Sequence, residues 1–260
     1  MGRRTETVAL LGFLVLDGIF AANGATAPAN DAKALEIAHA MMQAMGGQDA
    51  WNRAPFVRYD FKVTIGGKTV VDRAHLWSKQ TGDYRLEDKT KSGQPRVTLF
   101  NIASQKGSAY VAGKKLEGKA AVEAVKDGYA TFINDMYWLS MPWKWLDPGV
   151  HLKYLGEKSL GAKKFDVVEL SFDHVGLTPG DHYRAYVSPE SHLMEHWEYT
   201  LQGGQKGAWE WQYTTLNAPK LAKNHTDAKG DSINMGDVRI LKDVDPAFLQ
   251  DPSHSLSGLQ

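Results

Sequence analysis

A short string of histidine and glutamate has the spacing of a metal site. His192, Glu195 and His196 match the H-x-x-E-H order of inverted zinc metallopeptidases. That chemistry needs a helix, on which the two histidines share a face and the glutamate activates a metal-bound water. Here the string follows the turn-like residues 188–191 and runs on in a strand-like alternation. We therefore expect strand surface with no metal, no other cofactor and no catalytic residue. A zinc-dependent envelope enzyme is the alternative.

A second candidate site is the aromatic block at residues 136–145. It holds three tryptophans, one tyrosine and two methionines, and such side chains make large, adaptable apolar surfaces. The block either plugs the core of a sheet or lines a cavity for an apolar ligand. The two interpretations are compatible, because a plug that leaves space creates a pocket. The expected pocket residues are Met136, Tyr137, Trp138, Met141, Trp143, Trp145, Trp197, Tyr199, Trp209 and Trp211.

Composition removes several other chemistries. The 260-residue chain has no cysteine, which excludes disulfides, thiolate zinc sites, iron–sulfur clusters and cysteine nucleophiles. Lys+Arg and Asp+Glu both number 30, so the chain lacks the basic surplus typical of nucleic-acid-binding proteins. The sequence contains no G-x-S-x-G elbow and no Gly-rich phosphate loop. These absences favour a binding protein over an enzyme.

The first 27 residues have the pattern of a secretory signal peptide. Arg3 and Arg4 precede an apolar run at 8–16, and the Ala-Thr-Ala at 25–27 fits the small-x-small cleavage rule. We expect cleavage near Pro28 and a periplasmic or secreted mature protein. No later apolar run reaches the roughly 18 residues of a membrane span, so no transmembrane segment is expected in the mature chain.

Helical patterns are confined to two segments of the mature chain. Residues 31–45 place apolar side chains on one face, and Gly46 follows as a stop signal. Residues 119–145 continue a helical period as far as Met141, where Pro142 ends or kinks the helix. The aromatic block therefore lies at the end of a long helix.

The remainder predicts strands. Residues 57–65 alternate strictly between apolar and polar, and Gly66-Gly67 reads as a hairpin turn. Turn signals spaced by roughly 8–12 residues indicate a large antiparallel sheet, sandwich or barrel. Further strands are expected over 68–78, 83–88, 96–102, 108–112, 151–156, 164–172, 182–187, 193–202, 206–216, 219–228 and 232–241. We predict one α+β domain over 28–244 and a loose C-terminal tail over 245–260. In that domain, helices pack inside or across the concave face of a strongly curved antiparallel sheet.

Two segments resemble a known superfamily. Residues 155–172 contain G-E-x-x-x-G followed by V-V-E-L, and residues 183–200 contain Y-x-x-Y-V-x-P-x-x-x-L. This order is similar to the strand–turn–strand run of the Lol-type periplasmic lipoprotein carriers. Residues 38–51 and 137–148 resemble an uncharacterised secreted bacterial family within the same superfamily.

The resemblance implies an unclosed antiparallel β-barrel with helices covering its open side. It also implies a periplasmic carrier of a hydrophobic ligand, a lipid or lipoprotein acyl chains, with a part in outer-membrane lipoprotein sorting. Expected partners are a lipid or acylated protein and an envelope membrane protein. The sequence offers no counterpart of the carriers' functional arginine. A non-catalytic structural or partner-binding protein, with a filled barrel, stays open as another alternative.

Overall fold

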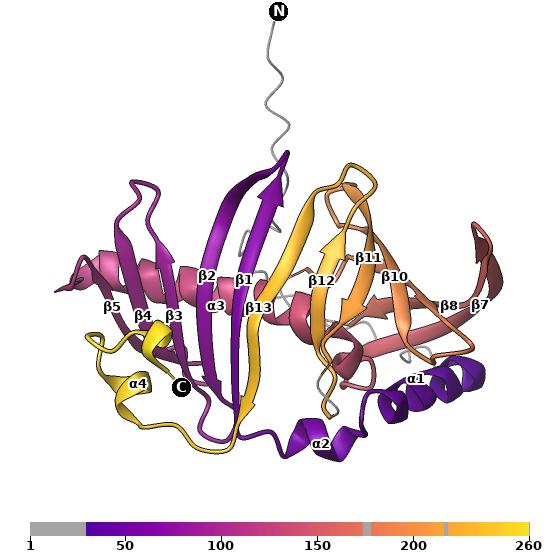
Figure 1. Cartoon of the computed structure of the whole chain (residues 1–260), viewed down its shortest axis with the longest axis horizontal. Coiled ribbons are helices and arrows are strands. Elements are labelled where there is room, and N and C mark those ends of the chain that lie inside the picture. Colours follow the sequence, from indigo (N-terminus) through magenta and orange to yellow (C-terminus); the bar gives the residue numbers. More distant parts are fainter. Residues whose placement is uncertain (1–29, 174–177, 216–217, 260) are drawn as a thin grey trace, which may run out of the picture.

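The computed structural model describes residues 30–173, 178–215 and 218–259. Within them, thirteen strands form one sheet in the order β6-β5-β4-β3-β2-β1-β13-β12-β11-β10-β9-β8-β7 (Figure 1). All pairings in this sheet are antiparallel. Because β6 and β7 end the order without pairing with each other, the sheet is an unclosed barrel, as predicted. The expected signal peptide, residues 1–27, lies outside the described residues.

The strands follow the alternation seen in the sequence. Their bounds are β1 Phe56–Ile65, β2 Lys68–Ser78, β3 Asp83–Lys89, β4 Pro95–Asn101, β5 Gly107–Val111, β6 Lys114–Lys115, β7 Val150–Leu160, β8 Lys163–Phe172, β9 His182–Val187, β10 Met194–Thr200, β11 Lys206–Tyr213, β12 Ala222–Thr226 and β13 Ser232–Leu241. In β1, Val57, Tyr59 and Phe61 are fully buried on the inner face, as period two requires. The first and last strands along the chain, β1 and β13, pair with each other at the centre of the sheet.

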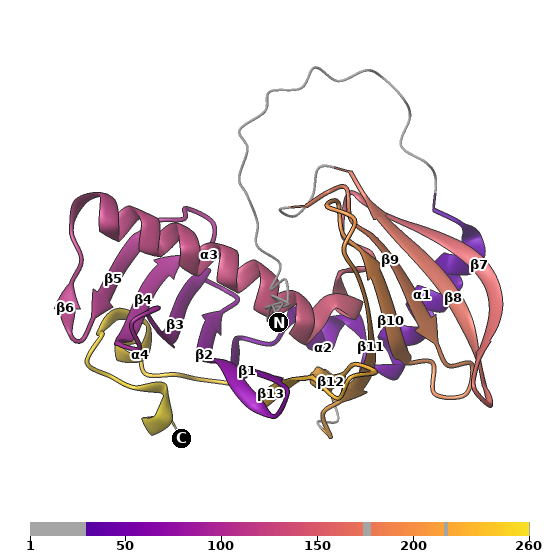
Figure 2. The same cartoon turned by 90° about the horizontal axis from the view of Figure 1, so that it is seen from above.

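The helices lie mainly on the concave side of this sheet. They are α1 Ala32–Ala44, α2 Gln48–Asn52, α3 Gly118–Ser140, the 3-10 helix η1 Met141–Lys144, α4 Ala247–Gln250 and the 3-10 helix η2 Leu256–Gly258. Figure 2 shows the sheet bending into two arms, with α3 lying along the arm of β2 to β5 and α1 beside β7 and β8. The predicted end of the long helix at Met141-Pro142 is confirmed, because η1 starts there.

Local signals explain where the first two helices begin. The Asp31 carboxylate accepts hydrogen bonds from the backbone N–H groups of Lys33 and Ala34 at 2.8 and 3.2 Å, which caps α1. Gly46 and Gly47 then take positive φ angles of 108° and 86°, so the chain can turn at once into α2. The sequence does not predict α2, because five residues are too few to show a helical period.

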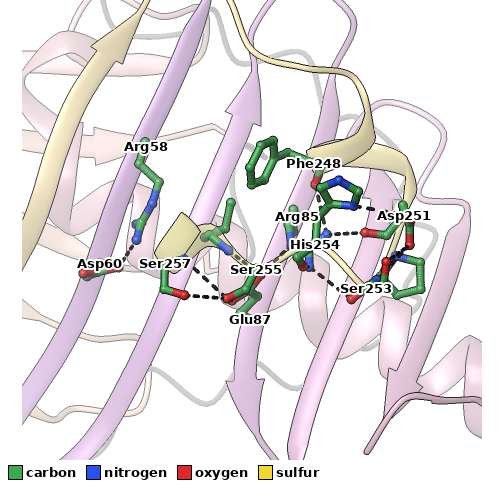
Figure 3. A network of polar contacts seen from close by, with 12 residues as sticks. Arg58, Asp60, Arg85, Glu87, Phe248, Asp251, Ser253, His254, Ser255 and Ser257 are labelled. Carbon is green, nitrogen blue, oxygen red and sulfur yellow. Dashed lines mark hydrogen bonds and ion pairs between the residues drawn. The ribbon is translucent and has the colours of Figure 1, made fainter. Parts of the chain in front are cut away.

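The tail differs from the expectation of a loose segment. The guanidinium of Arg85 on β3 is fully buried and holds the tail by its backbone carbonyls (Figure 3). It donates to the carbonyls of Phe248 and Asp251 at 3.0 and 2.9 Å, to Pro252 at 3.4 Å, and to His254. Leu256 packs with Leu76 in a small apolar cluster beneath the tail. The tail is therefore docked against the sheet, on the side opposite α3.

Replacing Arg85 should release the tail. In Arg85→Met the tail carbonyls lose their buried donors, so the segment moves into water or leaves them unpaired. We expect rapid proteolytic cleavage within residues 245–259 and a loss of about 3–5 kcal/mol of unfolding free energy in urea, as when other buried ionic networks are broken. The half-exposed Arg184, 3.9 Å from Glu169, is the matched control, and Arg184→Met should cost less than about 1 kcal/mol. An unchanged cleavage pattern in Arg85→Met would contradict this account.

Candidate functional site

A cavity of about 500 Å³ lies between α2, the C-terminal half of α3, η1 and the strands β2, β7, β8 and β9. Its volume falls in the range of roughly 300–1,000 Å³ that is usual for small-molecule sites. The lining residues are Gln48, Trp51, Asn52, Trp77, Phe132, Ile133, Asn134, Met136, Tyr137, Ser140, Trp143, Lys144, Asp147, Pro148, Val150, Phe172, Thr178 and Tyr183.

One wall of the cavity is aromatic. The ring of Trp51 stacks on that of Trp143, with centroids 5.9 Å apart and planes at 16°. Trp77 lies 6.3 Å from Trp51 and meets Phe132 edge-on at 5.6 Å. These four rings come from α2, η1, β2 and α3. Because aromatic side chains have few rotatable bonds, this wall is a rigid apolar surface.

Two phenol groups also line the cavity. Tyr137 and Tyr183 lie 5.7 Å apart between ring centroids, and the hydroxyl of Tyr183 donates to Asp181 Oδ2 at 3.0 Å. Burial, and then the nearby carboxylate of Asp181, raise the pKa of Tyr137 well above its ordinary value. Burial also raises the pKa of Tyr183. Both phenols therefore stay neutral at physiological pH and add hydrogen-bonding groups to the lining without a phenolate charge.

A buried ionic cluster, which we call the α3 anchor, fixes the helix that supplies much of this lining. It consists of Arg73, His75, Asn134 and Asp135. Arg73 Nη1 donates to both carboxylate oxygens of Asp135 at 3.0 and 2.9 Å. Asn134 Nδ2 donates to Asp135 Oδ1 at 2.7 Å, and His75 Nε2 lies 3.2 Å from Oδ2. The anchor ties α3 to the inner face of β2.

The anchor continues into the sheet through two tyrosines. His75 Nδ1 lies 2.7 Å from the hydroxyl of Tyr84, which is 3.0 Å from the hydroxyl of Tyr59. With His75 neutral, Nδ1 can accept from the hydroxyl of Tyr84, which in turn can accept from the hydroxyl of Tyr59. Burial lowers the pKa of His75 despite the neighbouring Asp135. Burial alone would raise the pKa of Asp135, but Arg73 and the bonds from His75 and Asn134 lower it.

The structure divides the predicted pocket residues into three groups. Met136, Tyr137 and Trp143 line the cavity. Tyr199 lies elsewhere and lines a polar groove with Glu198 and Lys206. The remaining six are buried in the core, where the ring of Trp138 meets those of Trp197 and Trp209 at 4.8 and 5.4 Å. These six are Trp138, Met141, Trp145, Trp197, Trp209 and Trp211.

Several lining residues were absent from the prediction. Trp51 lies on the unpredicted α2, and Trp77 lies on β2. Phe132 precedes the aromatic block by one helical turn, and Phe172 and Tyr183 end or begin neighbouring strands. The alternation of β2 places Trp77 on the same face as His75, which was a usable signal. The other lining residues lie far apart in the sequence and come together only in the folded, curved sheet.

The metal-like string lies away from this cavity. His192 has a φ of 55° in the turn before β10, and His196 Nδ1 lies 2.9 Å from Glu210 Oε1. Strict alternation would place Glu195 beside Trp197 on the inner face. A register shift between Met194 and His196 instead lets Glu195 bond Lys163 at 2.9 Å. Among the described residues, no group of three or more His, Cys, Asp or Glu side chains is placed to hold a metal ion.

Comparisons with known proteins find similarity at the level of fold. No protein-family model and no curated protein matches the chain. A DUF1329 family protein from Desulfovibrio piger is 10% identical, with 87% of this chain and 99% of that chain covered and a TM-score of 0.46. A domain named for outer membrane lipoprotein sorting, from Vibrio parahaemolyticus, is 10% identical over 84% and 97%, with a TM-score of 0.44.

A LolA superfamily protein from Nitrosomonas europaea is also similar. It is 12% identical, with 80% of this chain and 97% of that chain covered and a TM-score of 0.42. Separately, no helix among the described residues is long and apolar enough to cross a membrane.

Acid should destabilise the fold through its buried histidines. Burial lowers the pKa of His225, whose ring packs against Trp138, from 6.5 to about 3. Below pH 6.5 His225 becomes protonated in the unfolded chain but stays neutral in the folded protein. Its contribution to the free energy of unfolding is therefore fully present above pH 6.5 and is lost as the pH falls towards 3. Each such histidine contributes a slope of up to about 1.4 kcal/mol per pH unit.

We therefore expect the unfolding free energy in urea to fall between pH 6.5 and 4, and to fall less steeply in His225→Asn. The exposed His182 is the matched control, and His182→Asn should keep the wild-type slope. Equal slopes in wild type and His225→Asn would contradict the assignment of a neutral buried histidine.

Proposed function

We propose that this protein binds a hydrophobic ligand, a lipid or the acyl part of a lipoprotein, and carries it in the periplasm. The observation that carries the proposal is the cavity of about 500 Å³ with one aromatic wall. Protein interiors are normally filled to the density of organic crystals, and unfilled space is destabilising. A cavity of this size, bounded by rigid rings from four elements, is what a ligand site requires.

The chemistry of the lining supports an apolar ligand. Burying apolar surface yields roughly 25 cal/mol per Å² removed from water, so a single acyl chain could bind without many specific contacts. The polar lining groups lie among larger apolar ones and include neutral phenols, which suit the ester or amide groups at the end of an acyl chain. The α3 anchor keeps Phe132 and Met136 in place in the cavity lining.

The junction of α3 and η1 is the proposed entrance. Pro142 occupies the first turn of η1 and cannot continue the hydrogen bonds of α3. Trp143 follows it and contributes both a ring to the wall and an Nε1–H that donates to the carbonyl of Lys220 at 2.9 Å. A small movement of η1 would therefore displace one aromatic ring and open the wall while leaving α3 fixed.

Filling the cavity should abolish binding without unfolding the protein. Ile133 is half-buried, lines the cavity and lies on α3, so Ile133→Trp places an indole in the space meant for ligand. We expect wild type to bind the uncharged fluorescent probe N-phenyl-naphthylamine saturably, and Ile133→Trp to bind it at least about tenfold more weakly. Val122, 69% exposed on the same helix, is the matched control, and Val122→Trp should bind like wild type.

Two results would overturn the proposal. Wild-type binding that Ile133→Trp leaves unchanged would place the ligand outside this cavity. A wild-type protein that binds no uncharged apolar probe would have a filled barrel, and the structural or partner-binding alternative would replace the carrier.

A further inference from the structure

Two lysines lie beside the aromatic wall. Lys144 on η1 lines the cavity directly. Lys79 follows β2 and does not line it, but its Nζ lies 3.6 Å from the ring centroid of Trp51 and 5.7 Å from that of Trp77. Both of these rings line the cavity. One edge of the aromatic wall therefore carries ammonium groups.

The environment of Lys79 lacks a negative charge. Its ammonium donates to the carbonyl of Trp51 and faces aromatic rings, which attract cations through their negative faces. Within the part of the chain that the structure describes, no carboxylate forms an ion pair with it. Lys144 differs, because its Nζ lies 2.5 Å from Asp147 Oδ2. The two ammonium groups and one carboxylate leave this edge with a net positive charge.

The surroundings of Lys79 destabilise its protonated form. Burial, and then the positive charge of Lys144, lower the pKa of Lys79 from 10.5 to about 8. A bound anion would offset both effects, because an opposite charge nearby favours the protonated amine. The ammonium lacks only that anion to complete a charge-assisted pair.

We propose that the ligand of this cavity is an amphiphile with an anionic head group, which lies at Lys79 and Lys144 while the apolar chain fills the cavity. This inference rests on the proposed function and narrows its ligand class. The recognised chemistry is a carboxylate or phosphate oxygen beside two ammonium groups.

The test compares ligands that share a chain and differ in charge. Tetradecanoate, tetradecanol and tetradecyltrimethylammonium are titrated into the full chain by competition with N-phenyl-naphthylamine. Wild type should bind tetradecanoate about tenfold more tightly than tetradecanol, and the cationic ligand most weakly. Lys79→Gln should lose about tenfold for tetradecanoate and nothing for tetradecanol, which also shows that the variant is folded. Lys223→Gln, a change at an exposed lysine on β12, is the control and should match wild type.

A second measurement follows Lys79 without replacing it. The pKa of its amine, observed by NMR after selective isotope labelling of lysine, should rise by at least one unit when tetradecanoate is bound and stay constant with tetradecanol. A parallel titration with tetradecyl phosphate identifies the source of the head group. Tighter binding of the phosphate indicates a phospholipid, and tighter binding of the carboxylate indicates a fatty acid.

The outcomes separate this inference from the proposed function. Equal affinities for tetradecanoate and tetradecanol, in wild type and in Lys79→Gln, would overturn the anionic head group and leave an uncharged apolar ligand in the cavity. Failure of all the tetradecyl ligands and of N-phenyl-naphthylamine to bind wild type would overturn the cavity proposal itself.

Discussion

The position of α3 depends on the contacts of the buried Asp135 carboxylate with Arg73 and His75 of β2. A fully buried charge is costly unless it is paired and hydrogen-bonded, and Asp135 meets that condition only where Arg73 and His75 of β2 face it. Apolar packing alone would tolerate small rotations and shifts of a helix on a curved sheet. The α3 anchor adds a directional constraint, so it fixes both the rotation of α3 and its position along its axis.

That constraint determines what the rest of the concave face can form. With Asp135 turned towards β2, Ile133 and Tyr137 are turned to the cavity, while Trp138 fits between Trp197 and Trp209. One side of α3 therefore packs in the core, and another side lines the cavity. The aromatic wall keeps the hollow from collapsing, because stacked rings from α2 and η1 resist repacking. The docked tail packs on the other side of the sheet, and α3 packs on the concave side (Figure 2).

Much of the fold could be predicted from the sequence, because most of the longer β-strands show their period of two locally. The alternation in residues 57–65 and the helical period ending at Met141 both reappear as expected. The division of the aromatic block could not be predicted in the same way. The C-terminal half of α3 carries apolar side chains on nearly all sides, so the sequence pattern there does not separate Trp138 from Tyr137. The tail docks through backbone carbonyls that accept hydrogen bonds from Arg85. Because every residue has a backbone carbonyl, the sequence does not show which of them will do so.

Native mass spectrometry of the protein purified from an envelope fraction tests the central claim most directly. We expect a population of wild type that carries one lipid-sized adduct, which is released on collisional activation and is missing from Ile133→Trp prepared in the same way. A wild-type spectrum with the bare chain mass only, after gentle purification and after incubation with extracted envelope lipids, would contradict the claim that the cavity is a lipid site.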